Sequence, residues 1–76
     1  MREEELIKFL YEHDEEFRRL KEEHGWLHRK VEELNAKPVL TPTEKVKREE
    51  LKKRKLLLKD RMEEIMEEYR KRSEER

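Results

Sequence analysis

Cysteine and glutamine are absent from this 76-residue sequence, which contains only one glycine and two prolines. Without cysteine, the chain forms no disulfide and no zinc site with thiolate ligands. No apolar run approaches the roughly 20 residues that a membrane-spanning helix needs. The sequence begins with Met-Arg-Glu-Glu-Glu, which is unlike a secretory signal peptide. We therefore expect a cytoplasmic protein.

Charged residues make up 55% of the chain, against 32% hydrophobic residues. Lys plus Arg and Asp plus Glu each number 21, so the formal net charge is zero, which excludes a simple polybasic or acidic tail. The length allows one small domain. The many charged helix formers, with one asparagine and no glutamine, are typical of thermophilic proteins and also of coiled coils.

Apolar residues recur with the alternating spacing of a coiled coil. Successive positions in the first half are separated by 4 and 3 residues in strict alternation, and the second half repeats this spacing. A disordered chain would not keep such a period, so the pattern predicts two long amphipathic helices. The positions of this seam are Leu6, Leu10, His13, Phe17, Leu20, His24, Leu27, Val31 and Leu34, and then Leu51, Lys55, Leu58, Met62, Ile65 and Tyr69.

A short break separates the two patterns. Pro38 disfavours a helical conformation at the residue before it. Thr41-Pro42-Thr43-Glu44 then fits a capping box, with Thr41 as N-cap and Glu44 three residues later. So short a connection makes the helices antiparallel neighbours. We therefore predict an all-α fold, a coiled-coil-like antiparallel two-helix hairpin in one domain over 1–76. Its parts are helix 1 at about 3–36, a turn at about 37–41, helix 2 at about 42–72 and a frayed C-terminus at 73–76.

The hairpin predicts which seam residues face one another. If the turn centres near Val39, facing residues have numbers that sum to about 78 or 79. The polar seam residues His24 and Lys55 then share one layer, which acts as a register device because slipped pairings would bury them against apolar side chains. The other predicted pairs are Leu27 with Leu51, Leu20 with Leu58, Phe17 with Met62, Leu10 with Tyr69, and His13 with Ile65.

Two segments of the sequence resemble a known family. Residues 24–31 (HGWLHRKV), with Phe17 and Leu20 upstream, are similar to the F-x-x-L-x-x-x-H-x-x-L-[D]-x-x-I pattern of the small bacterial YdcH-like proteins. Residues 51–60 (LKKRKLLLKD) are similar to the second signature of that family, L-K-x-x-K-L-x-L-K-D. His28 departs from the pattern, which usually has Asp there. The resemblance covers roughly residues 6–69 and implies a helical hairpin in a bacterial cytoplasmic protein, with no known activity.

No constellation of residues indicates catalysis. His24 and His28, spaced i, i+4, would suit a metal ion, but the facing segment 50–55 is mostly Lys and Arg, which repel cations. We therefore interpret His24 as a seam residue and predict no metal or cofactor. The sequence has no glycine-rich phosphate loop, and a two-helix hairpin offers no concave site of the usual size. These observations favour a protein that is not an enzyme.

Charge is distributed unevenly along the predicted rod. Residues 1–16 carry two basic and seven acidic groups, whereas residues 45–61 carry nine basic and three acidic groups. The basic stretch is interpreted first as a solvated face, and alternatively as a surface for nucleic acid or as one pole of head-to-tail self-association. Its candidate residues are Lys45, Lys47, Arg48, Lys52, Lys53, Arg54, Lys59 and Arg61.

Several apolar residues lie outside the seam and form a candidate interface. A two-helix hairpin buries little surface, and domains of this size usually need oligomerisation or another support. We therefore predict a homo-oligomer, a dimer or tetramer, or contact with another protein. The function predicted is non-enzymatic protein–protein interaction. The candidate interface residues are Trp26, Val46, Leu56, Leu57 and Met66.

Overall fold

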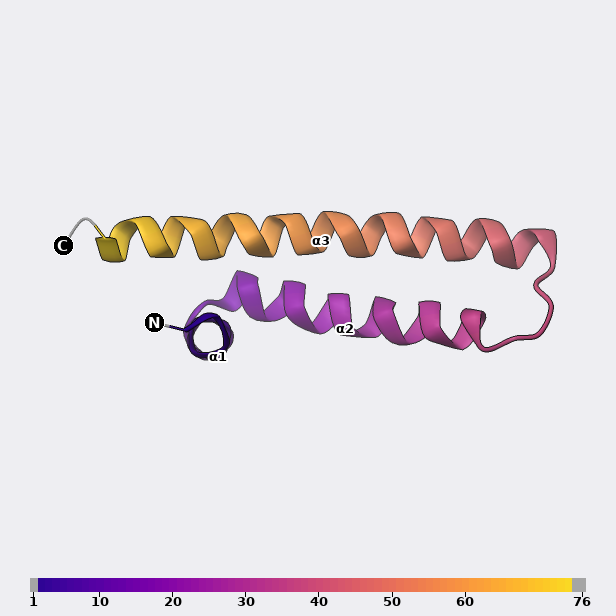
Figure 1. Ribbon diagram of the computed structural model, residues 1–76, viewed down its shortest axis with the longest axis horizontal. Coiled ribbons are helices and arrows are strands. Elements are labelled where there is room, and N and C mark those ends of the chain that lie inside the picture. The colour runs from indigo at the N-terminus through magenta and orange to yellow at the C-terminus, as the bar shows by residue number, and fades with distance from the viewer. Residues whose placement is uncertain (1, 75–76) are drawn as a thin grey trace.

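The structure is a computed structural model that describes residues 2–74. Within this range it contains three α-helices and no strand: α1 (Glu3–His13), α2 (Glu15–Asn35) and α3 (Pro42–Glu74). Helices α2 and α3 run antiparallel side by side, and α1 crosses them at the end opposite the turn, where Figure 1 shows it end-on. The molecule is a rod of 53 × 19 × 16 Å. The predicted all-α class is confirmed.

The connection between α2 and α3 has the predicted chemistry. The Thr41 N–H donates to Glu44 Oε1 at 3.0 Å, and the Glu44 N–H donates to Thr41 Oγ1 at 3.1 Å, which completes a reciprocal capping box. Lys37 forms an ion pair with the same glutamate. Helix α3 continues to Glu74, two residues beyond the predicted end, and residues 75–76 of the predicted frayed terminus lie outside the described range.

The prediction of one continuous helix over about 3–36 is wrong at Asp14. This residue is extended (φ −117°, ψ 111°), and its Oδ1 accepts a hydrogen bond of 2.9 Å from the Phe17 N–H, so it is the N-cap of α2. The Arg18 guanidinium donates to the carbonyls of Tyr11, at 2.9 Å, and Glu12, at 3.0 Å, in the last turn of α1. Each helix end at this elbow therefore has a side-chain hydrogen bond to its free backbone groups, and the fold is a three-helix arrangement rather than a plain hairpin.

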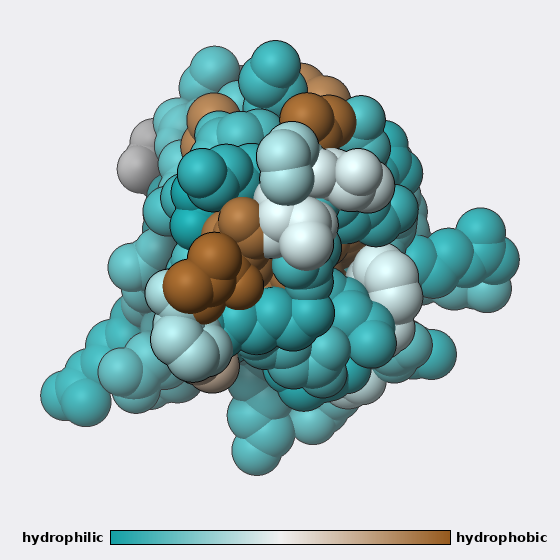
Figure 2. Space-filling view, turned by 90° about the vertical axis from the view of Figure 1, so that its right-hand side faces the viewer, coloured by the Kyte–Doolittle hydropathy of each residue, from teal (hydrophilic) through white to brown (hydrophobic). Residues whose placement is uncertain are grey.

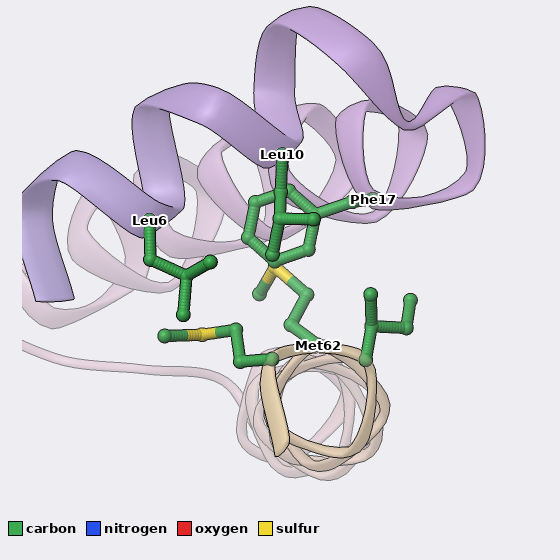
Figure 3. Close-up of a cluster of buried hydrophobic side chains, with 6 residues drawn as sticks. Leu6, Leu10, Phe17 and Met62 are labelled. Carbon is green, nitrogen blue, oxygen red and sulfur yellow. The ribbon is translucent and has the colours of Figure 1, made fainter. Parts of the chain in front are cut away.

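Two apolar clusters hold the three helices together. Leu27, Val31, Leu51 and Leu58 pack between α2 and α3. At the elbow end, Leu6 and Leu10 of α1 point toward Phe17 of α2 and Met62 of α3, as Figure 3 shows. This second cluster, completed by Ile65 and Met66, is the three-helix cluster. Because α1 folds back across the rod, it covers apolar surface that a two-helix hairpin would leave in water.

The predicted register agrees with these clusters. Leu27 lies in one cluster with Leu51, and Phe17 lies in the other with Met62. His13 differs from the prediction that it lies beside Ile65. It is exposed at the end of α1, where its ring centroid is 4.5 Å from that of Phe9, whose ring in turn lies 5.3 Å from Tyr69. The elbow explains the difference, because the helix axis changes direction directly after His13 and the residue leaves the seam.

Candidate interaction surfaces on the two flanks of the hairpin

One long side of the hairpin carries two ion pairs between helices. Arg54 of α3 donates to both carboxylate oxygens of Glu23, at 3.2 and 3.4 Å, and Arg61 donates to those of Glu16, at 3.2 and 3.0 Å. Bidentate geometry of this kind fixes the position of both side chains. Arg61 also donates to Glu64 on its own helix, and Glu16 and Glu64 together raise the pKa of its guanidinium above the ordinary value.

Exposed apolar residues lie on the same side as these ion pairs. Trp26 follows Glu23 by three residues, and Leu57 follows Arg54 by three residues, a spacing that keeps helix neighbours on one face. Val46 lies three turns before Leu57 on that face. The exposed fractions are 48% for Trp26, 60% for Val46 and 62% for Leu57. We call these three residues the Trp26 flank.

A hollow of about 290 Å³ opens beside Trp26. Leu34 and Leu51 supply its apolar lining, and Lys30, Glu33, Lys37 and Lys47 surround it. The Lys30 ammonium lies 5.7 Å from the centroid of the indole ring, a cation–π distance. The tryptophan therefore stands at the edge of a depression rather than alone on a convex surface.

Two residues predicted for this interface lie elsewhere. Met66 is only 5% exposed, because it packs against α1 in the three-helix cluster. Leu56 is 60% exposed, but as the residue before Leu57 it points about 100° around the helix. The Trp26 flank therefore retains three of the five predicted residues.

The polar layer predicted at His24 and Lys55 lies on the opposite flank. Lys55 Nζ is 3.0 Å from Nδ1 of His28, the residue one turn after His24. Burial is the main cause that lowers the pKa of His24 below its ordinary value, and the charges of Lys55, His28, Lys21 and Lys59 lower it further. The prediction did not include His28 in this layer, although its spacing from His24 already placed both on one face.

This opposite flank is hollowed where α1 crosses the hairpin. A groove of about 430 Å³ lies between the three helices, and we call it the histidine groove. Phe17, Met62 and Met66 form its floor together with Ile7 of α1. The charged and polar residues around it are Glu3, Lys21, His24, His28, Lys55, Lys59 and Glu63. Sequence reasoning missed this groove, because it exists only once α1 has folded back.

The predicted basic surface is partly neutralised. Arg48 and Lys52 lie within 4 Å of Glu49, and Arg54 and Arg61 bind the glutamates described above. Over the part of the chain that the structure describes, the other four predicted residues form no ion pair at that distance. These are Lys45, Lys47, Lys53 and Lys59.

The end of the rod formed by the turn is mostly polar. Figure 2 views this end and shows hydrophilic surface interrupted by small hydrophobic patches. Val39, at the turn, is 82% exposed. Isolated residues of this kind are ordinary on protein surfaces. The apolar hollows described above lie along the two flanks.

Two other kinds of feature are absent over residues 2–74. No three or more histidine, aspartate or glutamate side chains in this range are arranged to hold a metal ion. The helices described there include none with the length and apolar character to cross a membrane.

Comparison with known proteins gives a family for this chain. Residues 17–66 match the family model described as "Protein of unknown function (DUF465)". Neither the comparison with curated proteins nor the comparison with solved structures found a match. The matched segment runs through α2 and most of α3, whereas α1 lies before it. Because the match covers more than half of the sequence, the chain belongs to the DUF465 family, which includes the YdcH-like proteins.

Proposed function

We propose that this protein is a non-enzymatic bacterial cytoplasmic protein that acts through protein–protein contact, first with a second copy of itself. The observation that carries the proposal is the Trp26 flank. The half-exposed Trp26 lies beside an apolar hollow, and Val46 and Leu57 lie on the same face. Aromatic and apolar side chains of this kind are typical of the core of a protein interface. The polar and ion-paired residues around these three side chains suit an interface rim.

Two-fold symmetry favours a second copy as the occupant. A two-fold axis through the Trp26 flank, perpendicular to the rod, brings the same apolar side chains of both protomers together. Val46 and Leu57 lie within residues 45–61, which have a net charge of +6, so this arrangement sets the basic stretches of the two protomers against each other. Apolar contact therefore has to hold the dimer, and salt should screen the repulsion between the like charges.

The size of the Trp26 flank limits the affinity. The flank offers only three exposed apolar side chains on each protomer. These bury less surface than a standard interface, which covers about 800 Å² on each partner. We therefore propose a dimer with a dissociation constant of roughly micromolar order. A single apolar flank also supports a dimer rather than a tetramer, since a tetramer needs a second self-complementary surface.

Adjacent residues of α3 provide a matched test. Leu57→Ser should weaken the dimer, whereas Leu56→Ser, at the same exposure but on a different face, should leave it unchanged. The molar mass of each variant is measured by sedimentation, and circular dichroism verifies that both remain helical. Equal dissociation of the two variants, or none in either, contradicts the proposed interface.

A nucleic-acid-associated function is a second candidate, carried by Lys45, Lys47, Lys53 and Lys59. Within the described range these four lysines form no ion pair, so their charges are accessible to phosphates. Retention of the chain on RNA or DNA at about 0.05 M salt, with a steep loss as salt rises, would support this function. No retention at that salt concentration removes it.

A further inference from the structure

The histidine groove combines an apolar floor with a cationic wall. Phe17, Met62 and Met66 are buried in the three-helix cluster, yet each also borders the groove. Ile7 of α1 completes this floor. The volume of about 430 Å³ lies within the range of small-molecule sites, roughly 300–1,000 Å³. The groove therefore has room for one small molecule with both apolar and charged parts.

The charged side chains around this groove have a small positive surplus. Lys21, Lys55 and Lys59 border it together with the two histidines, whereas only Glu3 and Glu63 are acidic. Burial is the main cause of the lowered pKa of His24, and the neighbouring cations lower this pKa further. The surplus is local, because the surrounding end of the rod has a net negative charge over residues 1–16. A ligand that complements the groove is therefore an anion.

We propose that the histidine groove binds a single-chain anionic amphiphile, an alkyl carboxylate or alkyl phosphate. The alkyl chain lies along the floor formed by Ile7, Phe17, Met62 and Met66, and the anionic head group receives charge-assisted hydrogen bonds from Lys21, Lys55 and Lys59. This site is on the flank opposite Trp26 and does not depend on the proposed dimer.

The binding test uses the full chain and alkyl phosphates of six, eight and ten carbons, each kept below its micelle concentration. Isothermal titration calorimetry should show saturable binding of one ligand per chain. Affinity should rise with chain length by up to about fourfold for each buried methylene. An alkyl glycoside with ten carbons should bind at least tenfold more weakly, because it lacks the charge. Absence of saturation, or equal binding of the neutral compound, overturns the proposal.

Paired variants separate the groove from general surface charge. Lys21 and Lys59 are exposed, so Lys21→Glu combined with Lys59→Glu should preserve the fold and weaken binding at least tenfold. The control combines Lys45→Glu with Lys53→Glu, which makes the same change of net charge away from the groove. If both double variants lose affinity for the alkyl phosphate equally, the ligand does not bind in the groove.

Membrane lipids also combine alkyl chains with an anionic head group. Binding to vesicles therefore distinguishes a lipid bilayer from a dispersed single-chain compound as the ligand. A groove that takes one chain should bind the dispersed compound, and the protein should not sediment with phosphatidylglycerol vesicles. Sedimentation with the vesicles, in the absence of saturable binding of the dispersed compound, contradicts the proposal.

Histidine signals provide a readout within the groove itself. An anion bound near His24 favours its protonated form, so the ligand should raise the pKa of His24. The charged and titratable groups that line the groove together with this ring are Glu3 of α1, Lys21 and His28 of α2, and Lys55, Lys59 and Glu63 of α3. Nuclear magnetic resonance titration of the imidazole protons measures the shift, and no shift on binding overturns the proposed position of the head group.

Discussion

Asp14 redirects the chain through its side chain. Its carboxylate caps α2 by accepting the Phe17 N–H, while Arg18 binds the carbonyls at the end of α1. Each contact satisfies backbone groups that a helix end leaves without an intrahelical partner. The elbow is therefore a pair of complementary caps, and single substitutions at these positions should have measurable costs.

Asp14→Ala removes the cap of α2. We expect a loss of about 1 kcal/mol in the free energy of unfolding, since an uncapped N–H replaces a hydrogen-bonded one. Urea denaturation followed by circular dichroism measures the change. Glu15→Ala is the control in the next residue, whose exposed ion pair with Arg19 contributes only a few tenths of a kcal/mol. Equal effects of the two substitutions would show that Asp14 is not a cap.

His24 should make stability depend on pH near neutrality. Its pKa in the folded protein is lowered from the ordinary 6.5 by burial and by neighbouring cations, so below that pH the unfolded chain takes up more protons than the folded chain. The free energy of unfolding should therefore fall as pH decreases from about 7.5 to 5.5. Thermal unfolding of the wild type and of His24→Asn measures this. In the variant, the free energy of unfolding should depend less steeply on pH. An unchanged dependence on pH would show that His24 is not its cause.

At the scale of whole elements, α1 is the part that the sequence pattern placed wrongly. The alternating spacing continues from Leu10 through His13 to Phe17 without interruption, because the apolar faces of α1 and α2 both turn toward α3. Periodicity reports which face is buried and is insensitive to a change in axis direction. Asp14 followed by two glutamates was the local signal of a new helix start.

The parts predicted correctly depend on local or repeated signals. The capping box at Thr41 and Glu44 is local, and the positions of Leu27 and Leu51 repeat a pattern that extends along each helix. The burial of Met66 was not predictable in this way, since it depends on α1 crossing α3 from a distant part of the sequence. The histidine groove was missed for the same reason.

Leu6→Ala tests whether α1 is docked. Leu6 is 2% exposed in the three-helix cluster, so its truncation should lower the free energy of unfolding by about 2–5 kcal/mol. Lys8→Ala, at an exposed position of the same helix, should cost less than about 0.5 kcal/mol. Chemical denaturation compares the two. A small cost at Leu6 would mean that α1 does not pack on the hairpin.

The capping box at the start of α3 should titrate in acid. A hydrogen bond from Lys37, followed by the Thr41 N–H, lowers the pKa of Glu44 from 4.5 to about 2. This contribution to stability is therefore complete above about pH 4.5 and is lost as pH falls through about 2. The free energies of unfolding of the wild type and of Glu44→Gln should differ at pH 5 and converge near about pH 2. Glu32→Gln, exposed on α2, is the control, and a difference that persists unchanged at low pH contradicts the account.

At the scale of the whole molecule, the crossing helix leaves the two flanks with different characters. One flank presents Trp26, Val46 and Leu57 beside cross-helix ion pairs, and the other presents the histidine groove. The first suits another protein surface, and the second suits a small anionic amphiphile. The dimer that we propose on the first flank would be weak and would form by mass action, so mass must be measured over a range of concentrations.

Sedimentation equilibrium of the full chain is the most direct measurement, made over about 1 to 1,000 µM and at about 0.05 M and 1 M salt. The account predicts that the molar mass rises with concentration from 9.7 kDa to twice that value. The rise should persist at high salt, because apolar contact holds the dimer and salt screens the like charges that face each other. A mass that stays at one chain throughout would contradict self-association through the Trp26 flank. A dimer that dissociates completely at high salt would place the contact at the oppositely charged ends instead.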